Sequence, residues 1–244
     1  MTFVSRFSTQ NSDAERFASD IQVPFAIGYD GLIAENEGKI GDDVWWFRDG
    51  QTLVIYGTGE SWMYHVPSDG TYEKELEAKK AFTSAPEFYL YKDEIRKVLV
   101  LDGVEKLNDY LLFNINIESI ELGTVKYLGL TVLGNTLLKE VTIPETVELI
   151  RGFTFSECQQ LSHVTILGDC NMELSIFHNT PNLKEVRFAS GVRIQDGEFG
   201  DLFNQNDVEE YHEPNEELVF YVTQGSDAQR YAEQHDIDYQ YYEE

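Results

Sequence analysis

The sequence predicts a β-rich (α+β) solenoid of about five short coils with parallel strands, with an N-terminal β-hairpin cap and a C-terminal strand-helix-strand cap. Three observations predict this fold. An apolar pattern recurs at near-constant spacing, a hairpin signal precedes it, and a strand, a helix start and a second strand follow it. A single coil of this kind cannot bury its apolar face, so the fold depends on stacking and on capped ends.

The recurring pattern is apolar-x-x-apolar-x-apolar, with a further apolar residue four positions later. Its second position is occupied by Val98, Ile120, Val141, Val164 and Val186, at successive intervals of 22, 21, 23 and 22 along the chain. Leucine-rich repeats have periods of about 20–29 residues. The sequence therefore predicts a leucine-rich-repeat solenoid with repeats of 21–23 residues.

Within each copy, apolar and polar residues alternate as they do on a half-buried strand. Val141 and Ile143 are thus expected to point inward, and the residues beside them outward. The fourth apolar position fails once, at Lys126, where we expect the neighbouring Val125 to enter the core by a one-residue slip.

One copy has a recognisable family pattern. Residues 141–161 read VTIPETVELIRGFTFSECQQL, which resembles the BspA-like leucine-rich repeat. The match includes Pro144, Phe155 and Cys158, together with Gly152 displaced by one position. The other four copies are degenerate, since they lack the proline and do not keep the cysteine.

The flanks share this resemblance, which covers roughly residues 38–242. It implies a bacterial surface or secreted protein that contacts host or matrix proteins. Residues 1–17 lack the run of roughly 7–15 apolar residues that a secretory signal needs, so no signal peptide is visible. Either the protein is intracellular or a leader is missing, and the extracellular or cell-surface location rests on the resemblance alone.

The expected organisation has four parts. They are an N-terminal segment with a short helix (1–37), a β-hairpin cap with a helical insertion (38–94), the solenoid (95–203), and an acidic loop with the C-terminal cap (204–244).

The hairpin is predicted from Asp49-Gly50, a dipeptide favoured in two-residue turns. In that register Trp46 faces Leu53 and Trp45 faces Val54, so both surfaces carry large apolar groups. At least one surface must be covered, and we expect the hairpin to cap the open edge of the solenoid.

Helix signals lie outside the repeats. Capping-box spacing predicts a short helix near residues 13–21 and another starting at Ser226, and the charged stretch 73–82 is a third candidate. Residues 203–217 are expected to form an acidic loop, and residues 237–239 to supply the closing strand.

The net charge restricts the partners. Lysine and arginine total 18 against 44 aspartate and glutamate residues, so the formal charge is 18 − 44 = −26. This field repels phosphates, so we expect neither nucleic acid nor anionic lipid to bind. It favours cationic or neutral ligands and also promotes solubility. No stretch approaches the roughly 20 apolar residues of a membrane helix, so we expect no membrane insertion.

No catalytic, cofactor-binding or metal-binding constellation is evident, so we expect no enzyme, no cofactor and no metal site. The five histidines show no H-x-x-x-H spacing. Cys158 could pair with His163 as a thiolate would require, but Cys158 occupies an inward repeat position where core packing is favoured. Cys170 stands where other copies have valine, so it is also assigned to the core.

The candidate partner-binding face consists of the outward residues of the repeat strands. They are Lys97, Leu99, Ser119, Glu121, Glu140, Thr142, His163, Thr165, Glu185 and Arg187. This mixture contains no continuous aromatic anchor patch of the kind that dominates many protein interfaces, so a merely solvated face remains the alternative.

The leading hypothesis is a non-enzymatic recognition module that binds a protein partner. The alternative is a carbohydrate-binding or glycan-processing protein that uses the Trp45/Trp46 hairpin and the acidic loops. A third possibility is a spacer in a larger surface assembly.

Overall fold

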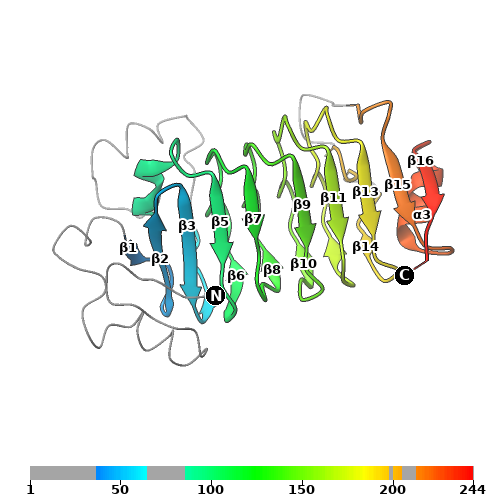
Figure 1. Cartoon of the computed structure of the whole chain (residues 1–244). Helices are drawn as coiled ribbons and strands as arrows, with labels where there is room; N and C mark the ends of the chain where they lie inside the picture. The colour runs from blue at the N-terminus through cyan, green and yellow to red at the C-terminus, as the bar shows by residue number, and fades with distance from the viewer. Residues whose placement is uncertain (1–36, 65–85, 198–199, 205–212, 244) are drawn as a thin grey trace.

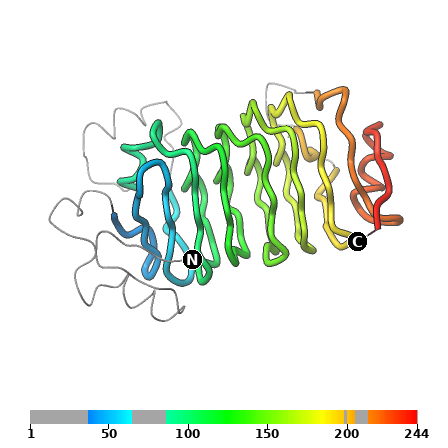
Figure 2. Tube along the Cα trace, viewed as in Figure 1, coloured from blue at the N-terminus to red at the C-terminus, as the bar shows by residue number. Residues whose placement is uncertain are grey.

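A computed structural model describes residues 37–64, 86–197, 200–204 and 213–243. The chain winds into a row of stacked coils, which runs from the N-terminal hairpin in blue to the C-terminal helix in red (Figure 1). Figure 2 shows the backbone returning to the same faces of the stack in coil after coil. The predicted parallel-strand solenoid is confirmed.

One side of the stack carries the longer strands. These are β1 (Glu37–Lys39), β2 (Val44–Asp49), β3 (Thr52–Gly57), β5 (Lys97–Val100), β7 (Ser119–Glu121), β9 (Glu140–Ile143), β11 (His163–Ile166), β13 (Glu185–Phe188), β15 (Val219–Val222) and β16 (Asp238–Tyr241). They form two five-stranded sheets, β1-β2-β3-β5-β7 and β16-β15-β13-β11-β9. The hydrogen-bonded ladder is therefore interrupted between β7 and β9.

The next side carries one short strand from each coil. These are β4 (Gly59–Glu60), β6 (Val104–Leu107), β8 (Tyr127–Leu128), β10 (Leu149–Ile150), β12 (Asn171–Met172) and β14 (Arg193–Ile194), in one parallel sheet. Six coils of the described chain thus hold both a long and a short strand. The additional coil, formed by β3 and β4, comes first along the chain and precedes the five copies counted in the sequence.

Strand pairing places equivalent repeat positions opposite each other. Val98 pairs with Ile120, and Val164 pairs with both Val141 and Val186. The near-constant spacing in the sequence therefore becomes a shared register in the structure, as predicted.

The one-residue slip at the imperfect copy is also confirmed. Val125 is fully buried, whereas Lys126 is exposed and its Nζ lies 2.8 Å from Glu105 Oε1 on the preceding coil.

The predicted hairpin turn is wrong by one residue, because the turn lies one position later in the chain. Asp49 pairs with Thr52 and Trp46 with Ile55, so the turn residues are Gly50 and Gln51. Gly50 has a φ of 58° and is followed by a residue without positive φ, as a type II′ turn requires. The predicted Asp49-Gly50 turn would instead have to be of type I′, with Asp49 also at positive φ.

The hairpin continues the solenoid as well as ending it. β3 pairs in parallel with β5, while β2 and β1 extend the same sheet with antiparallel pairing. The 3-10 helix η1 (Glu87–Tyr91) covers the inner side, where the Phe88 ring meets Trp46 edge to face at a centroid distance of 5.4 Å. Trp46 is consequently 1% exposed.

The outer arcs of the coils add a third set of hydrogen bonds between neighbours. Leu133 N–H donates to Thr154 O at 3.1 Å, and Phe155 N–H to Ile176 O at 3.0 Å. The arcs repeat an unusual conformation, since non-glycine residues with positive φ recur as the pairs Tyr110 and Asn114, Thr131 and Asn135, Phe153 and Glu157, and Ser175 and Asn179.

The C-terminal cap agrees with the prediction. Ser226 Oγ accepts the Gln229 N–H at 3.2 Å and starts α3 (Asp227–Gln234). Tyr231 on this helix is 1% exposed and accepts the Leu202 N–H at 3.1 Å through its hydroxyl oxygen. β16 then pairs in parallel with β15 and ends the sheet.

Three predicted segments fall wholly or partly outside the described residues. These are the helix near 13–21, the charged helix 73–82 and most of the acidic loop 203–217.

The alternation of inward and outward residues can be tested on β9. Ile143 is fully buried, whereas its neighbour Thr142 is exposed. We expect Ile143→Ala to lower the free energy of unfolding by about 2–5 kcal/mol, because it leaves a cavity in the shared core. The matched Thr142→Ala variant should lose less than about 1 kcal/mol. Urea denaturation measures both, and equal losses would contradict the assigned faces.

Candidate partner-binding face

The outward residues of the C-terminal sheet stand in straight rows across the strands. One row is Glu140, His163 and Glu185, and the next is Thr142, Thr165 and Arg187. The second row continues through Tyr221 on β15. Parallel pairing in register therefore gathers six of the predicted face residues onto one surface.

The N-terminal sheet presents a different surface. Lys97 and Glu121, from β5 and β7, form an ion pair at 2.6 Å. Leu99 packs beside an apolar cluster on the same side of the sheet, made up of Trp45, Phe47, Val54, Tyr56 and Leu101. The four predicted residues on β5 and β7 thus belong to the N-terminal sheet, which is not hydrogen-bonded to β9; they are Lys97, Leu99, Ser119 and Glu121.

A cavity of about 210 Å³ opens on the C-terminal sheet. Its lining contains His163, Thr165, Glu185 and Arg187, all predicted face residues, together with Tyr221. We call this group the strand-face pocket.

The Arg187 guanidinium is the most distinctive group of the strand-face pocket. Its Cζ lies 4.4 Å from the centroid of the Tyr242 ring and 5.6 Å from that of Tyr221. The Tyr242 hydroxyl donates to Phe188 O at 2.5 Å, which holds its ring in place. Within the described part of the chain, Arg187 forms no ion pair with a carboxylate.

His163 and Glu185 form the other polar wall. Ser162 Oγ lies 2.8 Å from His163 Nδ1, and His163 Nε2 lies 3.7 Å from Glu185 Oε1. Both side chains are about half exposed. The pocket thus offers ring, guanidinium and carboxylate groups that remain accessible to a partner.

Two residues of this surface were missing from the sequence prediction. Tyr221 lies on β15, which begins at Val219, later than the regular period counted from Glu185 would place it, and Tyr242 follows the last strand. The outward alternation of Val219 and Tyr221 was the available signal for Tyr221. No pattern in the sequence indicated that Tyr242 returns to Arg187.

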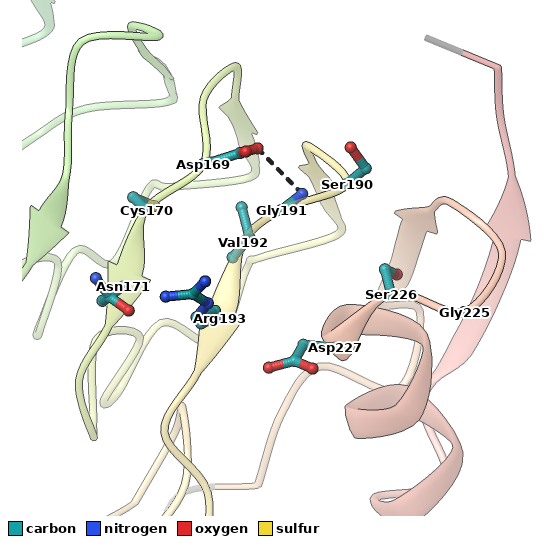
Figure 3. A pocket seen from close by; sticks show the side chains of 10 residues that line it. All are labelled: Asp169, Cys170, Asn171, Ser190, Gly191, Val192, Arg193, Gly225, Ser226 and Asp227. Carbon is teal, nitrogen blue, oxygen red and sulfur yellow. Dashed lines mark hydrogen bonds between the residues drawn. The ribbon is translucent and has the colours of Figure 1, made fainter.

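A second cavity, of about 310 Å³, lies between the last coil and the cap helix (Figure 3). Asp169, Arg193 and Asp227 line it, but the two carboxylates are used within the fold. Asp169 Oδ1 accepts the Gly191 N–H at 3.1 Å, and Asp227 pairs with Arg230 at 2.7 Å. This cavity therefore belongs to the junction between solenoid and cap.

The possible nucleophile is buried in the core. Cys158 is fully buried, and its Sγ lies 3.2 Å from Leu133 O and 3.3 Å from Thr136 Oγ. His163 is exposed on the sheet face, so the two residues considered as a catalytic pair lie on different sides of the sheet. Burial raises the pKa of the Cys158 thiol and raises that of Cys170 to about 12.

Two other kinds of feature are absent from the described residues. No group of three or more histidine, cysteine, aspartate or glutamate side chains there could hold a metal ion. No helix in those ranges is long and apolar enough to cross a membrane.

Comparisons with known proteins agree with the repeat. The family model for the BspA type leucine rich repeat region matches residues 83–204, half of the chain, in six copies. No curated protein gives a match.

Two solved leucine-rich repeat proteins are similar in structure. One, from Eubacterium ventriosum, is 18% identical with a TM-score of 0.46, covering 64% of this chain and 45% of that one. One from Bacteroides ovatus is 16% identical with a TM-score of 0.35, covering 80% and 55%. The chain thus spans about half the length of these proteins.

The burial of both cysteines predicts their reactivity. At pH 8 a thiol reagent such as DTNB should leave the folded protein unmodified and should titrate both thiols after unfolding, because reaction requires an exposed thiolate. Rapid labelling at pH 8 would contradict the core assignment.

The raised pKa values of the two thiols also affect stability. The folded chain keeps these protons above pH 9, where the unfolded chain loses them, so the free energy of unfolding should fall as the pH rises from about 9 to about 12.

Proposed function

The chain belongs to the BspA-type leucine-rich-repeat family, and on this premise we propose that it is a non-enzymatic recognition module that binds a protein partner. The observation that carries this proposal is the strand-face pocket. Arg187 and Tyr221 line it together, on strands whose register is fixed by the stack.

The residue types of the strand-face pocket are those that dominate protein interfaces. Arginine and tyrosine are enriched among the few residues that contribute most of the binding energy. Arg187 lies over Tyr221 and Tyr242, so its planar group is already oriented and less conformational freedom is lost when it binds. A carboxylate of the partner is the natural acceptor for such a guanidinium.

The other cationic side chains of the sheet face have acidic neighbours, which leaves Arg187 as the candidate for binding a partner. Lys97 is occupied by Glu121, and His163 lies next to Glu185. Four of the six described arginines pair with a carboxylate, and Arg187 and Arg193 are the two described arginines that do not. This supports recognition by Arg187 of a group that the protein itself does not supply.

The proposed location is the bacterial surface or the extracellular space, with a host or matrix protein as the partner. The family assignment supports this, because proteins with this repeat are typically surface-associated. The proposed absence of catalysis is supported by the same family and by the burial of Cys158 away from His163.

The alternative function, carbohydrate binding, relied on exposed tryptophan rings of the hairpin. Trp46 is 1% exposed and packs on Phe88, while Trp45 is half buried beside the apolar cluster of the N-terminal sheet. The hairpin tryptophans are therefore not a free surface for a sugar ring.

The proposal can be tested with the immobilised full chain and a panel of purified plasma and matrix proteins, using biolayer interferometry. We expect at least one member to bind, and Arg187→Gln to weaken that binding about thirtyfold, the effect of an interface residue worth about 2 kcal/mol. Thr142→Arg should also weaken binding, because it places a bulky side chain in the same row.

Arg193→Gln is the matched control, because Arg193 lies on β14, outside the sheet face. It should leave binding unchanged. The proposal fails if no protein in the panel binds, or if Arg187→Gln and Thr142→Arg bind as well as Arg193→Gln.

A further inference from the structure

A tryptophan at the N-terminal end of the solenoid is exposed although its backbone is firmly held. Trp62 is 40% exposed, whereas Ser61 before it and Tyr64 after it are 1% and 4% exposed. The Trp62 N–H donates to Ile40 O, and the Ser61 N–H donates to Lys106 O at 2.9 Å. The held backbone on both sides therefore keeps the indole at the surface.

The indole is oriented as well. Its Nε1–H donates to Asp42 Oδ1 at 3.2 Å. The loop that carries Asp42 approaches β4 very closely at Gly41, where an added Cβ atom would overlap the carbonyl oxygen of Glu60. Only glycine permits this approach, so the position of Asp42 beside Trp62 is built into the backbone.

These residues surround a cavity of about 420 Å³, which we call the Trp62 pocket. Its lining includes Asp42, Asp43, Glu60, Trp62, Met63 and Lys106. Met63 is 67% exposed and adds a polarisable side chain to the rim. The cavity is large enough for a small organic group.

The charges in the Trp62 pocket are not balanced. Lys106 Nζ lies 3.1 Å from Glu60 Oε2 and 4.4 Å from the centroid of the Tyr127 ring, so this cation is already engaged. Its hydrogen bond to Glu60 holds the pKa of that carboxyl below its usual range. Among the residues that the structure describes, no cation lies within ion-pair distance of Asp42 or Asp43.

We propose that the Trp62 pocket binds an organic ammonium group, with the cation over the indole of Trp62 and the carboxylates of Asp42 and Asp43 beside it. Tryptophan gives the strongest cation–π attraction of the aromatic side chains. The two carboxylates add Coulomb attraction, and the net charge of −26 raises the local concentration of cations. Anionic ligands are disfavoured by the same charges.

The site is distinct from the strand-face pocket and does not depend on the proposed function. A neutral sugar could use the same indole, but it would gain nothing from the excess negative charge. An ammonium group can come from a lysine side chain or from a choline-type headgroup, and both share the chemistry that the pocket recognises.

Nuclear magnetic resonance on the ¹⁵N-labelled full chain provides the test. The chain has three tryptophans, so three indole signals are expected, and the one missing from Trp62→Leu belongs to Trp62. Choline and Nα-acetyl-lysine methylamide are the two ammonium probes, and the stronger of them identifies the source. The neutral isostere 3,3-dimethyl-1-butanol and methyl glucoside are the neutral probes.

We expect an ammonium probe to shift the Trp62 indole signal saturably, and added sodium chloride to weaken its binding. Saturation-transfer difference signals of the probe allow the variants to be compared. Trp62→Leu should weaken binding by about two- to thirtyfold, the range of a cation–π contact. Asp43→Asn should weaken it by about two- to fivefold. Tyr241→Leu is the matched control, since Tyr241 is an exposed aromatic residue at the other end of the solenoid.

The proposal is overturned if neither ammonium probe shifts the Trp62 signal. It is also overturned if the neutral isostere binds as tightly as choline, which would indicate a merely apolar pocket, or if methyl glucoside binds instead.

Discussion

The structure depends on one constraint, that the parallel strands of each coil form their ladder hydrogen bonds with the strands of neighbouring coils and not within the coil. The two rows of strands and the outer arcs are paired in this way, apart from the interruption between β7 and β9. Such bonds form only if successive coils have nearly equal length, and no coil is stable without its neighbours. The recurring positive φ of non-glycine residues in the arcs, a conformation that costs free energy, is maintained because the neighbouring coils require it.

The same constraint decides where irregular sequence can go. From Val186 to its partner Phe220 on β15 the chain runs well beyond the length of a regular coil, yet the two residues pair in register. After β14 the chain still pairs with the preceding arc, since the Phe177 N–H donates to Leu202 O at 2.9 Å, and β15 then rejoins the sheet, so the ladder is preserved. Lengthening a surface loop costs little entropy, whereas lengthening a coil would shift every pairing beyond it.

Register also explains how much the sequence could predict. The near-constant period determines which side chains meet, so the core residues and six of the face residues could be placed before any coordinates were known. The hairpin turn was misplaced by one residue because Asp49-Gly50 and Gly50-Gln51 both suit a two-residue turn and both keep Trp46 on the inner face. A shift of this kind leaves the alternation unchanged, so hydrophobic pattern cannot detect it.

The residues that the pattern missed lie where the repeat gives no information. Tyr242 reaches Arg187 because β16 adds a further strand to the stack. The position of Tyr242 therefore depends on a cap that lies outside the repeat. The exposure of Trp62 follows from hydrogen bonds made by its neighbours and from the close approach at Gly41, neither of which leaves a periodic signal. Functional candidates therefore concentrate at the two ends of the solenoid, where coils meet caps and the regular pattern stops.

The two ends also relate differently to the charge of the whole molecule. At the N-terminal end the negative field draws cations toward Trp62 and the two carboxylates beside it, so long-range attraction and local contact act together. At the C-terminal end the same field opposes the approach of a carboxylate to Arg187. Screening at physiological salt weakens that repulsion beyond about 8 Å. A partner of Arg187 must therefore gain its affinity at short range, from desolvated contacts with the guanidinium and the tyrosine rings, and this favours a large and shape-complementary protein surface over a small anion.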